Sequence, residues 1–251
     1  MKSAFCLSGL SRAIPITYHW IKKYYLDPYN ADVYFRSWSN TGIEGDYSPI
    51  RAIELYKPIR WELEYFDEQA YIAKTLALCE GNQDRIDKTL AANRHRVLAM
   101  WYNIQKCYEL IIPDISKYDI VFRGRPDGYY ITKFDFNTFE RDTLYILGSK
   151  FNDAFAAGTP EVMGHFCRTY SRLYDFLSVY DTLPGKYWLC PHTLLEATLQ
   201  RIEKFGFKVV RLKDNIRAGK IWGQPILDLN TDINVMIKYY EDEYHKEMQN
   251  E

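Results

Sequence analysis

Charged residues crowd the end of one short apolar segment, YDIVFRGRPDGYY, which runs from Tyr118 to Tyr130. Arginine guanidiniums bind phosphate oxygens in a bidentate manner, and carboxylates bind hard divalent cations through oxygen. Arg123, Arg125 and Asp127 occupy alternate positions, so in an extended chain they would point the same way. We therefore expect this segment to bind a diphosphate. The alternative is a solvated turn that carries charge for solubility.

A second candidate phosphate site lies near the N-terminus, in the segment CLSGLSR. Glycine lets the backbone approach a ligand closely, and an arginine reaches a phosphate or a base edge. We expect Ser8, Gly9 and Arg12 to contact a nucleotide in this way. The motif is not GxGxxG, and a turn with no ligand is the alternative.

Arg94 belongs to a further basic group, together with His95 and Arg96. Only one of Arg94 and Arg96 can share a helical face with a pocket, because faces repeat every three to four residues. We expect Arg94 to turn towards the diphosphate, with Asn93 as an alternative contact. A solvated helix face is the competing interpretation.

Two carboxylates are candidates for acid–base chemistry. Asp153 precedes a run of small residues, AFAAG, which leaves room for a bulky ligand. A base within hydrogen-bond reach activates an acceptor hydroxyl, so Asp153 is our candidate base, and capping of a turn is the alternative. Glu196 follows His192 by four residues, so the two share a helical face and could act together, although this spacing is common in helices.

The elements that must position these residues alternate along the first half of the chain. Hydrophobic patterns predict strands over 4–7, 32–38, 59–66 and 118–122, and helices over 16–25, 49–57 and 82–111. The order βαβαβ favours a parallel sheet with helices on its faces. In such sheets ligands bind beyond the carboxyl ends of the strands, where CLSGLSR and RGRPD both lie.

The sequence pattern of the second half of the chain predicts fewer helices and strands than that of the first half. The patterns indicate strands over 130–136, 143–147 and 207–212, a loop over 151–158, a helix over 160–177 and a helix over 191–205. Ser48 and Thr159, each followed by proline, are the expected N-caps of two helices, and Gly206 is the expected stop of another.

Composition limits the classes of protein that this chain can belong to. With 251 residues, the chain is long enough for one domain, expected over 1–231, and a C-terminal surface helix over 232–251. Its net charge of −1 gives no field for nucleic acid, and the sequence has no apolar run of membrane-spanning length. The 5 cysteines include no CxxC pair, which favours reduced thiols and a cytoplasmic location. The 22 tyrosines indicate either packing at the core edge or a surface that stacks on sugar rings.

Taken together, the motifs resemble those of the GT-A-type glycosyltransferases found in bacterial polysaccharide gene clusters and in large algal DNA viruses. The matching segments are CLSGLSR, DVYFRSW, NRHRVLAMWYNIQKCYEL, YDIVFRGRPD, NDAFAAGTPEVM and PHTLLEATLQRIEKFGFKVV. The resemblance implies an α/β fold, a single Rossmann-like GT-A domain with a mostly parallel central sheet flanked by helices. It also implies a nucleotide-sugar donor, a glycan acceptor and often a divalent cation.

The chain departs from this family pattern at the expected metal motif. Such enzymes commonly have Asp-x-Asp where this chain has Arg125-Pro126-Asp127. Mn²⁺ or Mg²⁺ would then be held by Asp127, with His192 as a further ligand, a role that late histidines have in several such enzymes. Arginines could instead neutralise the diphosphate without a metal. The rival functions are a noncatalytic carbohydrate-binding protein and a sugar nucleotidyltransferase, although the lysine-containing phosphate loop typical of the latter is not visible.

Overall fold

The structure is a computed structural model, and it describes most of the chain. The described residues are 1–11, 14–40, 48–129, 134–147, 154–173, 175–176, 189–212 and 219–220. The expected C-terminal helix over 232–251 therefore lies outside the described residues, as do Arg12 and Asp153.

One seven-stranded sheet organises these residues, with strand order β3-β2-β1-β4-β7-β6-β8. Its strands are β1 (Ser3–Ser8), β2 (Asp32–Trp38), β3 (Arg60–Glu64), β4 (Ile120–Gly124), β6 (Thr143–Leu147), β7 (Phe155–Gly158) and β8 (Lys208–Leu212). All neighbouring pairs are parallel except those that β7 makes with β4 and with β6. The order β3-β2-β1-β4 is that of one half of a doubly wound, Rossmann-like sheet.

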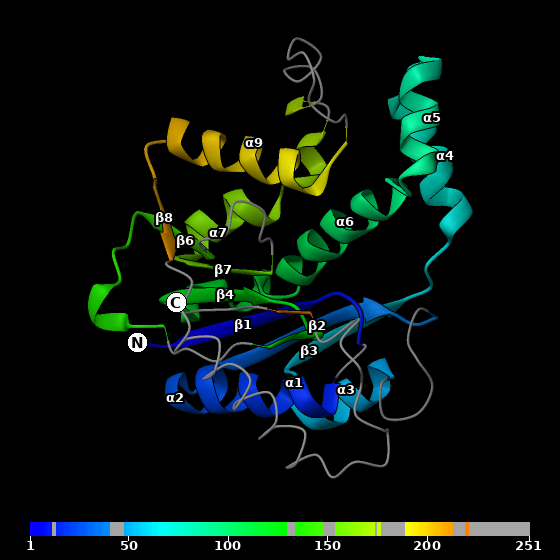
Figure 1. Cartoon of the computed structure of the whole chain (residues 1–251). Helices are drawn as coiled ribbons and strands as arrows, with labels where there is room; N and C mark the ends of the chain where they lie inside the picture. Colours follow the sequence, from blue (N-terminus) through cyan, green and yellow to red (C-terminus); the bar gives the residue numbers. More distant parts are fainter. Residues whose placement is uncertain are drawn as a thin grey trace, which may run out of the picture.

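Helices cover both faces of this sheet (Figure 1). On one face lie α1 (Ile14–Ile21), which continues as a π-helix (Lys22–Leu26), α2 (Asp27–Tyr29) and α3 (Pro49–Tyr56). On the other face lie α6 (His95–Glu109), α7 (Pro160–Cys167) and α9 (Pro191–Lys204). The protein therefore has two hydrophobic layers, one on each side of the sheet. The predicted fold class, a mostly parallel central sheet flanked by helices, is confirmed.

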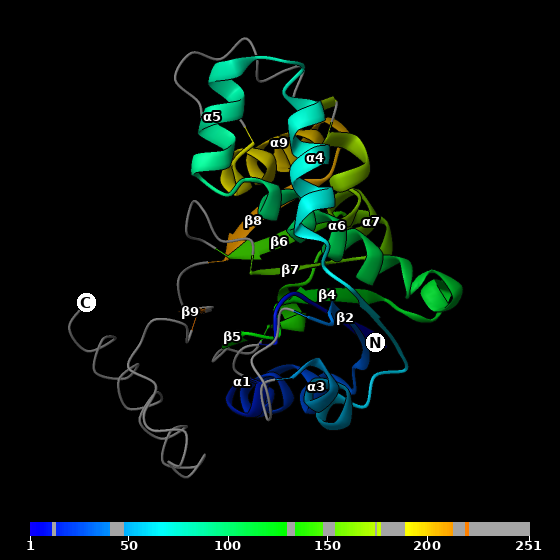
Figure 2. The same ribbon diagram turned by 90° about the vertical axis from the view of Figure 1, so that its right-hand side faces the viewer.

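Two further helices, α4 (Glu68–Leu78) and α5 (Gln83–Ala91), project beyond the sheet. Figure 2 shows them side by side, away from the strands. The remaining elements are β5 (Gly128–Tyr129), which pairs with β9 (Gly219–Lys220), and 3₁₀ turns over Ile112–Lys117, Phe136–Thr138 and Tyr170–Arg172. None of the helices that the structure describes is both long and apolar enough to span a bilayer.

The helix ends follow the predicted capping chemistry. The Ser48 hydroxyl accepts a hydrogen bond from the Arg51 amide at 3.1 Å, and the Thr159 hydroxyl accepts one from the Val162 amide at 3.5 Å. Gly206, two residues after α9, has a φ of +89°. These local signals were therefore sufficient to set the starts of α3 and α7 and the end of α9.

The main correction concerns β7, because the sequence analysis assigned 151–158 to a loop. Phe155–Gly158 is instead an antiparallel strand between β4 and β6. Ala156 packs in one hydrophobic layer and Ala157 in the other, and both are fully buried. A strand buried on both faces shows no alternation of polar and apolar residues, so its pattern resembled a loop of small residues.

Two other predicted elements were too long, and the described part of a third forms no strand. The expected helix over 82–111 is divided into α5 and α6 at Asn93, whose φ of +51° interrupts the helical backbone. The helix that begins at Pro160 ends at Cys167, well before residue 177. In place of the strand expected over 130–136, the described part of that range leads into the 3₁₀ turn at Phe136–Thr138.

Candidate functional site

Two loops that are far apart in the sequence meet at the carboxyl edge of the sheet. Gly9, directly after β1, has a φ of +136°, and a Cβ atom there would lie 3.5 Å from the Pro126 side chain. Pro126 belongs to the turn after β4, and its carbonyl accepts a hydrogen bond from the Thr17 hydroxyl at 2.6 Å. The segments CLSGLSR and RGRPD, each predicted to bind a nucleotide, therefore adjoin one another.

Arg125 and Asp127 form a bidentate pair within the RGRPD turn. Arg125 Nε lies 2.8 Å from Asp127 Oδ1, and Arg125 Nη2 lies 2.9 Å from Oδ2. The Asp127 side chain is only 2% exposed and that of Arg125 is 12% exposed. The alternative of a solvated turn is therefore wrong for these two residues, because their charged groups are buried and paired with each other.

Arg123 occupies a different environment from Arg125. It lies within β4 opposite Cys6 of β1, and its side chain is buried in the layer beneath α6 and α7. Burial raises the pKa of the Cys6 and Cys167 thiols, and nearby Arg123 lowers both pKa values only in part. Arg123 therefore does not share the environment of Arg125 and Asp127, although alternation had predicted that all three would point the same way.

The strongest polar cluster at this edge was not predicted from the sequence, and it is centred on Arg36 of β2. The Arg36 side chain is fully buried, and its Nη1 donates to Asn103 Oδ1 on α6 at 2.5 Å. Its Nη2 donates to Glu64 Oε2 at the end of β3. The guanidinium also lies 5.0 Å from the ring centroids of Trp38 and Tyr102.

Glu64 is the exposed member of this cluster. Its side chain is 39% exposed, while Arg36 and the Tyr102 hydroxyl, at 3.3 Å, both contact its Oε2 atom. Burial raises the pKa of Tyr102, with Glu64 adding to the effect, so its hydroxyl keeps the proton that it donates. Glu62, one pleat back along β3, lies 3.6 Å from Arg36 and is 45% exposed.

The basic group around Arg94 lies further out along α6. Arg94 is the N-cap residue of α6 and precedes Asn103 by nine residues, about 13 Å of helix. His95 and Arg96 both contact Glu68 of α4, through its Oε1 atom at 2.9 and 3.0 Å. These two residues hold α4 against α6, so part of the group has a structural role.

His192 and Glu196 lie in the first turns of α9. The helix runs antiparallel to β8, so its amino end faces the carboxyl edge of the sheet. His192 is half-buried and Glu196 is exposed. Among the described residues, no three histidine, cysteine, aspartate or glutamate side chains form a group suited to a metal ion.

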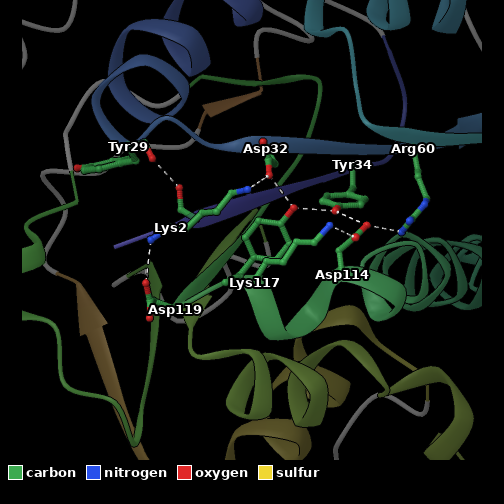
Figure 3. Close-up of polar contacts among 10 residues, drawn as sticks. Lys2, Tyr29, Asp32, Tyr34, Arg60, Asp114, Lys117 and Asp119 are labelled. Carbon is green, nitrogen blue, oxygen red and sulfur yellow. Dashed lines mark hydrogen bonds and ion pairs between the residues drawn. The ribbon is translucent and has the colours of Figure 1, made fainter.

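A second polar network lies at the opposite, amino edge of the sheet (Figure 3). Asp114 Oδ2 contacts Arg60 Nη1 at 2.6 Å and the Tyr34 hydroxyl at 3.3 Å, and Oδ1 contacts Lys117. The Tyr34 hydroxyl also forms a hydrogen bond with the Tyr118 hydroxyl at 2.8 Å.

A cavity of about 400 Å³ lies elsewhere, between α1, α2 and α3, and its lining includes no residue of the carboxyl edge.

Comparison with known proteins gives likenesses to solved structures but no sequence match. No protein-family model matches the chain, and no curated protein matches it. Among solved structures it is similar to the apo form of mouse xyloside xylosyltransferase 1, with a TM-score of 0.44, 9% identity, and coverage of 85% of this chain and 86% of that one. A likeness at this level assigns neither an activity nor a substrate, so any function must be argued from the residues themselves.

Proposed function

We propose that this protein is a glycosyltransferase that moves a sugar from a nucleotide-sugar donor onto a glycan acceptor. The observation that carries the proposal is the close approach of the Gly9 loop to the Pro126 turn at the carboxyl edge of four parallel strands. The Gly9 amide itself donates to the Arg36 carbonyl, but a glycine lets a ligand approach this loop closely, and the neighbouring arginine-containing turn supplies a guanidinium fork that suits a diphosphate. The sequence resemblance points to the same class of reaction.

In the proposed reaction, an acceptor hydroxyl oxygen forms a bond to the anomeric carbon of the sugar. The bond from that carbon to the diphosphate oxygen breaks, and the nucleoside diphosphate leaves with the electron pair. Asp153 is proposed to take the hydroxyl proton, and Glu196 is the alternative base. Arg12 and Arg125 are proposed to stabilise the charge on the leaving diphosphate, where fixed donors lower the barrier most.

The Arg125–Asp127 pair gives this site a specific property. Asp127 engages Nε and Nη2 of Arg125. Binding of the donor diphosphate to these same two nitrogens would therefore replace the Asp127 carboxylate with the diphosphate at the Arg125 guanidinium. Ser8, Gly9 and Arg94 are the other proposed donor contacts, and Arg123 would act on the same charge from beneath the sheet edge.

The residues at this edge do not form a ready metal site. Both Asp127 oxygens accept hydrogen bonds from Arg125, and the described residues do not gather three metal-ligating side chains. The reaction is therefore proposed with residues of the chain alone. That Mn²⁺ or Mg²⁺ binds to Asp127 and His192 stays a prediction, and transfer measured in EDTA tests it.

A thermal-shift panel of UDP, GDP, dTDP and their sugars, with and without Mn²⁺, tests the donor class. A ligand that binds only the native state raises the melting temperature by mass action. We expect at least one nucleotide sugar to stabilise the protein and to release nucleoside diphosphate when a glycan acceptor is added. Stabilisation by oligosaccharides but by no nucleotide would overturn the proposal and favour a carbohydrate-binding protein.

A further inference from the structure

Glu64 has one carboxylate oxygen committed to the fold and one that is not. Oε2 accepts from Arg36 and from Tyr102, whereas Oε1 has no hydrogen-bond partner among the residues that the structure describes. Because the side chain is 39% exposed, Oε1 is accessible at the carboxyl edge. The contacts of Oε2 therefore orient the Glu64 carboxylate, while Oε1 accepts no hydrogen bond from any described residue.

Arg36 is the residue that fixes this direction. Its guanidinium is fully buried, held by Asn103 and flanked by the Trp38 and Tyr102 rings, so it has little freedom to move. A buried planar fork locks the carboxylate that it contacts far better than an exposed lysine would. Arg36 is therefore a positioning residue for Glu64.

Unpaired polar atoms lie next to this pair. Within the described part of the chain, Asn103 Nδ2, Arg36 Nε and Ser8 Oγ are buried and have no hydrogen-bond partner. Asn103 is 2% exposed, Ser8 is 1% exposed, and Ser8 is the register partner of Arg36 in the adjacent strand. Buried donors are rarely left unpaired in native proteins, so these atoms point to a bound group or water that completes the cluster.

The chemistry of the exposed atoms selects the kind of group that binds. A carboxylate oxygen is an acceptor only, and it takes hydrogen bonds from neighbouring hydroxyls. A carboxylate at the carboxyl edge of a nucleotide-binding sheet commonly accepts from a ribose 2′-hydroxyl.

We infer that Glu64 Oε1 binds a vicinal diol, and that the diol belongs to the ribose of the nucleotide donor. This inference rests on the proposed function and narrows it, because it selects UDP or GDP donors over dTDP, which lacks the 2′-hydroxyl. The other source of the same chemistry is a diol of the transferred sugar.

The test compares ribonucleotides with 2′-deoxyribonucleotides. Titration calorimetry measures the dissociation constants of UDP, GDP, dUDP and dGDP for the wild type, Glu64→Ala and the matched control Glu62→Ala. We expect the wild type to prefer the ribonucleotide by about 10- to 100-fold, the range for a hydrogen bond to a charged group. Glu64→Ala should bring this ratio close to one without weakening the deoxynucleotide, and Glu62→Ala should keep the wild-type ratio.

A second arm identifies the source of the diol. If Glu64→Ala weakens a nucleotide sugar but not its nucleoside diphosphate, the diol belongs to the sugar; the diol site then stands and the ribose assignment falls. Arg36→Lys should lower the ribo-to-deoxy ratio to an intermediate value, which a purely structural role would not do. If the Glu64→Ala variant does not fold, Glu64→Gln replaces it in the same binding measurements.

Two outcomes distinguish failure of the diol site from failure of the proposed function. If the wild type binds nucleotides, and Glu64→Ala changes neither the ribo-to-deoxy ratios nor the affinity for nucleotide sugars, the diol site is wrong and the proposed function stands. If the wild type binds no nucleotide and no nucleotide sugar, the proposed function is wrong and this inference falls with it.

Discussion

The two edges of the central sheet carry polar networks of similar composition but different completeness. At the amino edge, Asp114 uses both carboxylate oxygens on Arg60, Lys117 and Tyr34. At the carboxyl edge, Glu64 leaves Oε1 without a partner among the described residues, and Asn103 leaves its amide nitrogen unpaired there. Each network joins arginine, carboxylate and tyrosine across neighbouring strands.

If Glu64 binds a ligand as proposed, this difference separates a network that stabilises the fold from one that a ligand completes. A network whose acceptors are filled has completed its hydrogen bonding in the folded chain, and nothing more is needed to stabilise it. A network with an accessible acceptor and buried unpaired donors is completed only by something else.

Replacing Asp153 should affect chemistry more than any change at the amino edge. If Asp153 is the base, Asp153→Asn should slow sugar transfer by about 10²- to 10⁴-fold, because proton removal from the acceptor is lost, while nucleoside diphosphate binding stays normal. Steady-state transfer and calorimetric binding measure the two effects. Asp119→Asn, at the amino edge, is the control and should transfer at the wild-type rate. Equal losses of binding and transfer in Asp153→Asn would show that the residue is not a base.

The buried and the exposed arginine should differ in their contribution to stability. Arg36→Met should lower the free energy of unfolding by roughly 2–4 kcal/mol, because it removes a buried guanidinium with its ion pair to Glu64 and leaves the Asn103 side-chain oxygen without its donor. Arg60→Met, at the amino edge, should cost roughly 1 kcal/mol or less, since the Arg60 side chain is 38% exposed. Urea unfolding of both variants gives the comparison. Similar costs would mean that burial does not distinguish the two networks.

Replacing arginine with lysine keeps the positive charge but removes the planar guanidinium. This change should weaken nucleoside diphosphate binding only at the carboxyl edge. Arg125→Lys should weaken nucleoside diphosphate binding by roughly 1–3 kcal/mol, because lysine cannot make the bidentate contact. Arg60→Lys should leave binding unchanged. Calorimetric titration of both variants measures this. Wild-type affinity in Arg125→Lys would remove Arg125 from the donor site.

The smallest effect concerns the acid sensitivity of the amino edge. The Lys117 ammonium holds the pKa of the Asp114 carboxyl below its usual range, with Arg60 adding to the effect and burial opposing it. Because the folded pKa is lowered, this stabilisation is present above the unfolded pKa of about 4 and is lost as pH falls through the folded pKa.

The melting temperature of Asp114→Asn should therefore lie below that of the wild type at pH 7, and the difference should shrink as the pH is lowered below about 4. Scans of thermal unfolding against pH measure it. Asp84→Asn, on the exposed face of α5, should show no such convergence. A constant difference for Asp114→Asn at every pH would show that the carboxylate charge is not what stabilises this edge.

The position of the candidate site at the carboxyl edge could be predicted from the sequence, because it depends on the order of the elements along the chain. The βαβαβ pattern put the loops after β1 and β4 at one edge, and Gly9 and Pro126 do lie in contact there. The Arg125–Asp127 pair was not foreseen, since the alternation that suggests a shared direction cannot show that the two side chains would neutralise each other. The strand β7 was missed because its small residues are buried on both faces and give no periodic signal.

Capped helices, short apolar strands and the glycine stop could be predicted from the sequence, because their signals depend on residues a few positions apart. Which polar side chains meet could not be predicted, because it depends on the tertiary structure. Arg36, Glu64 and Asn103 lie far apart in the chain, and the register that sets Arg36 opposite Glu62 and beside Ser8 brings them under α6. That register depends on the packing of helices against the whole sheet, so no short segment contains it.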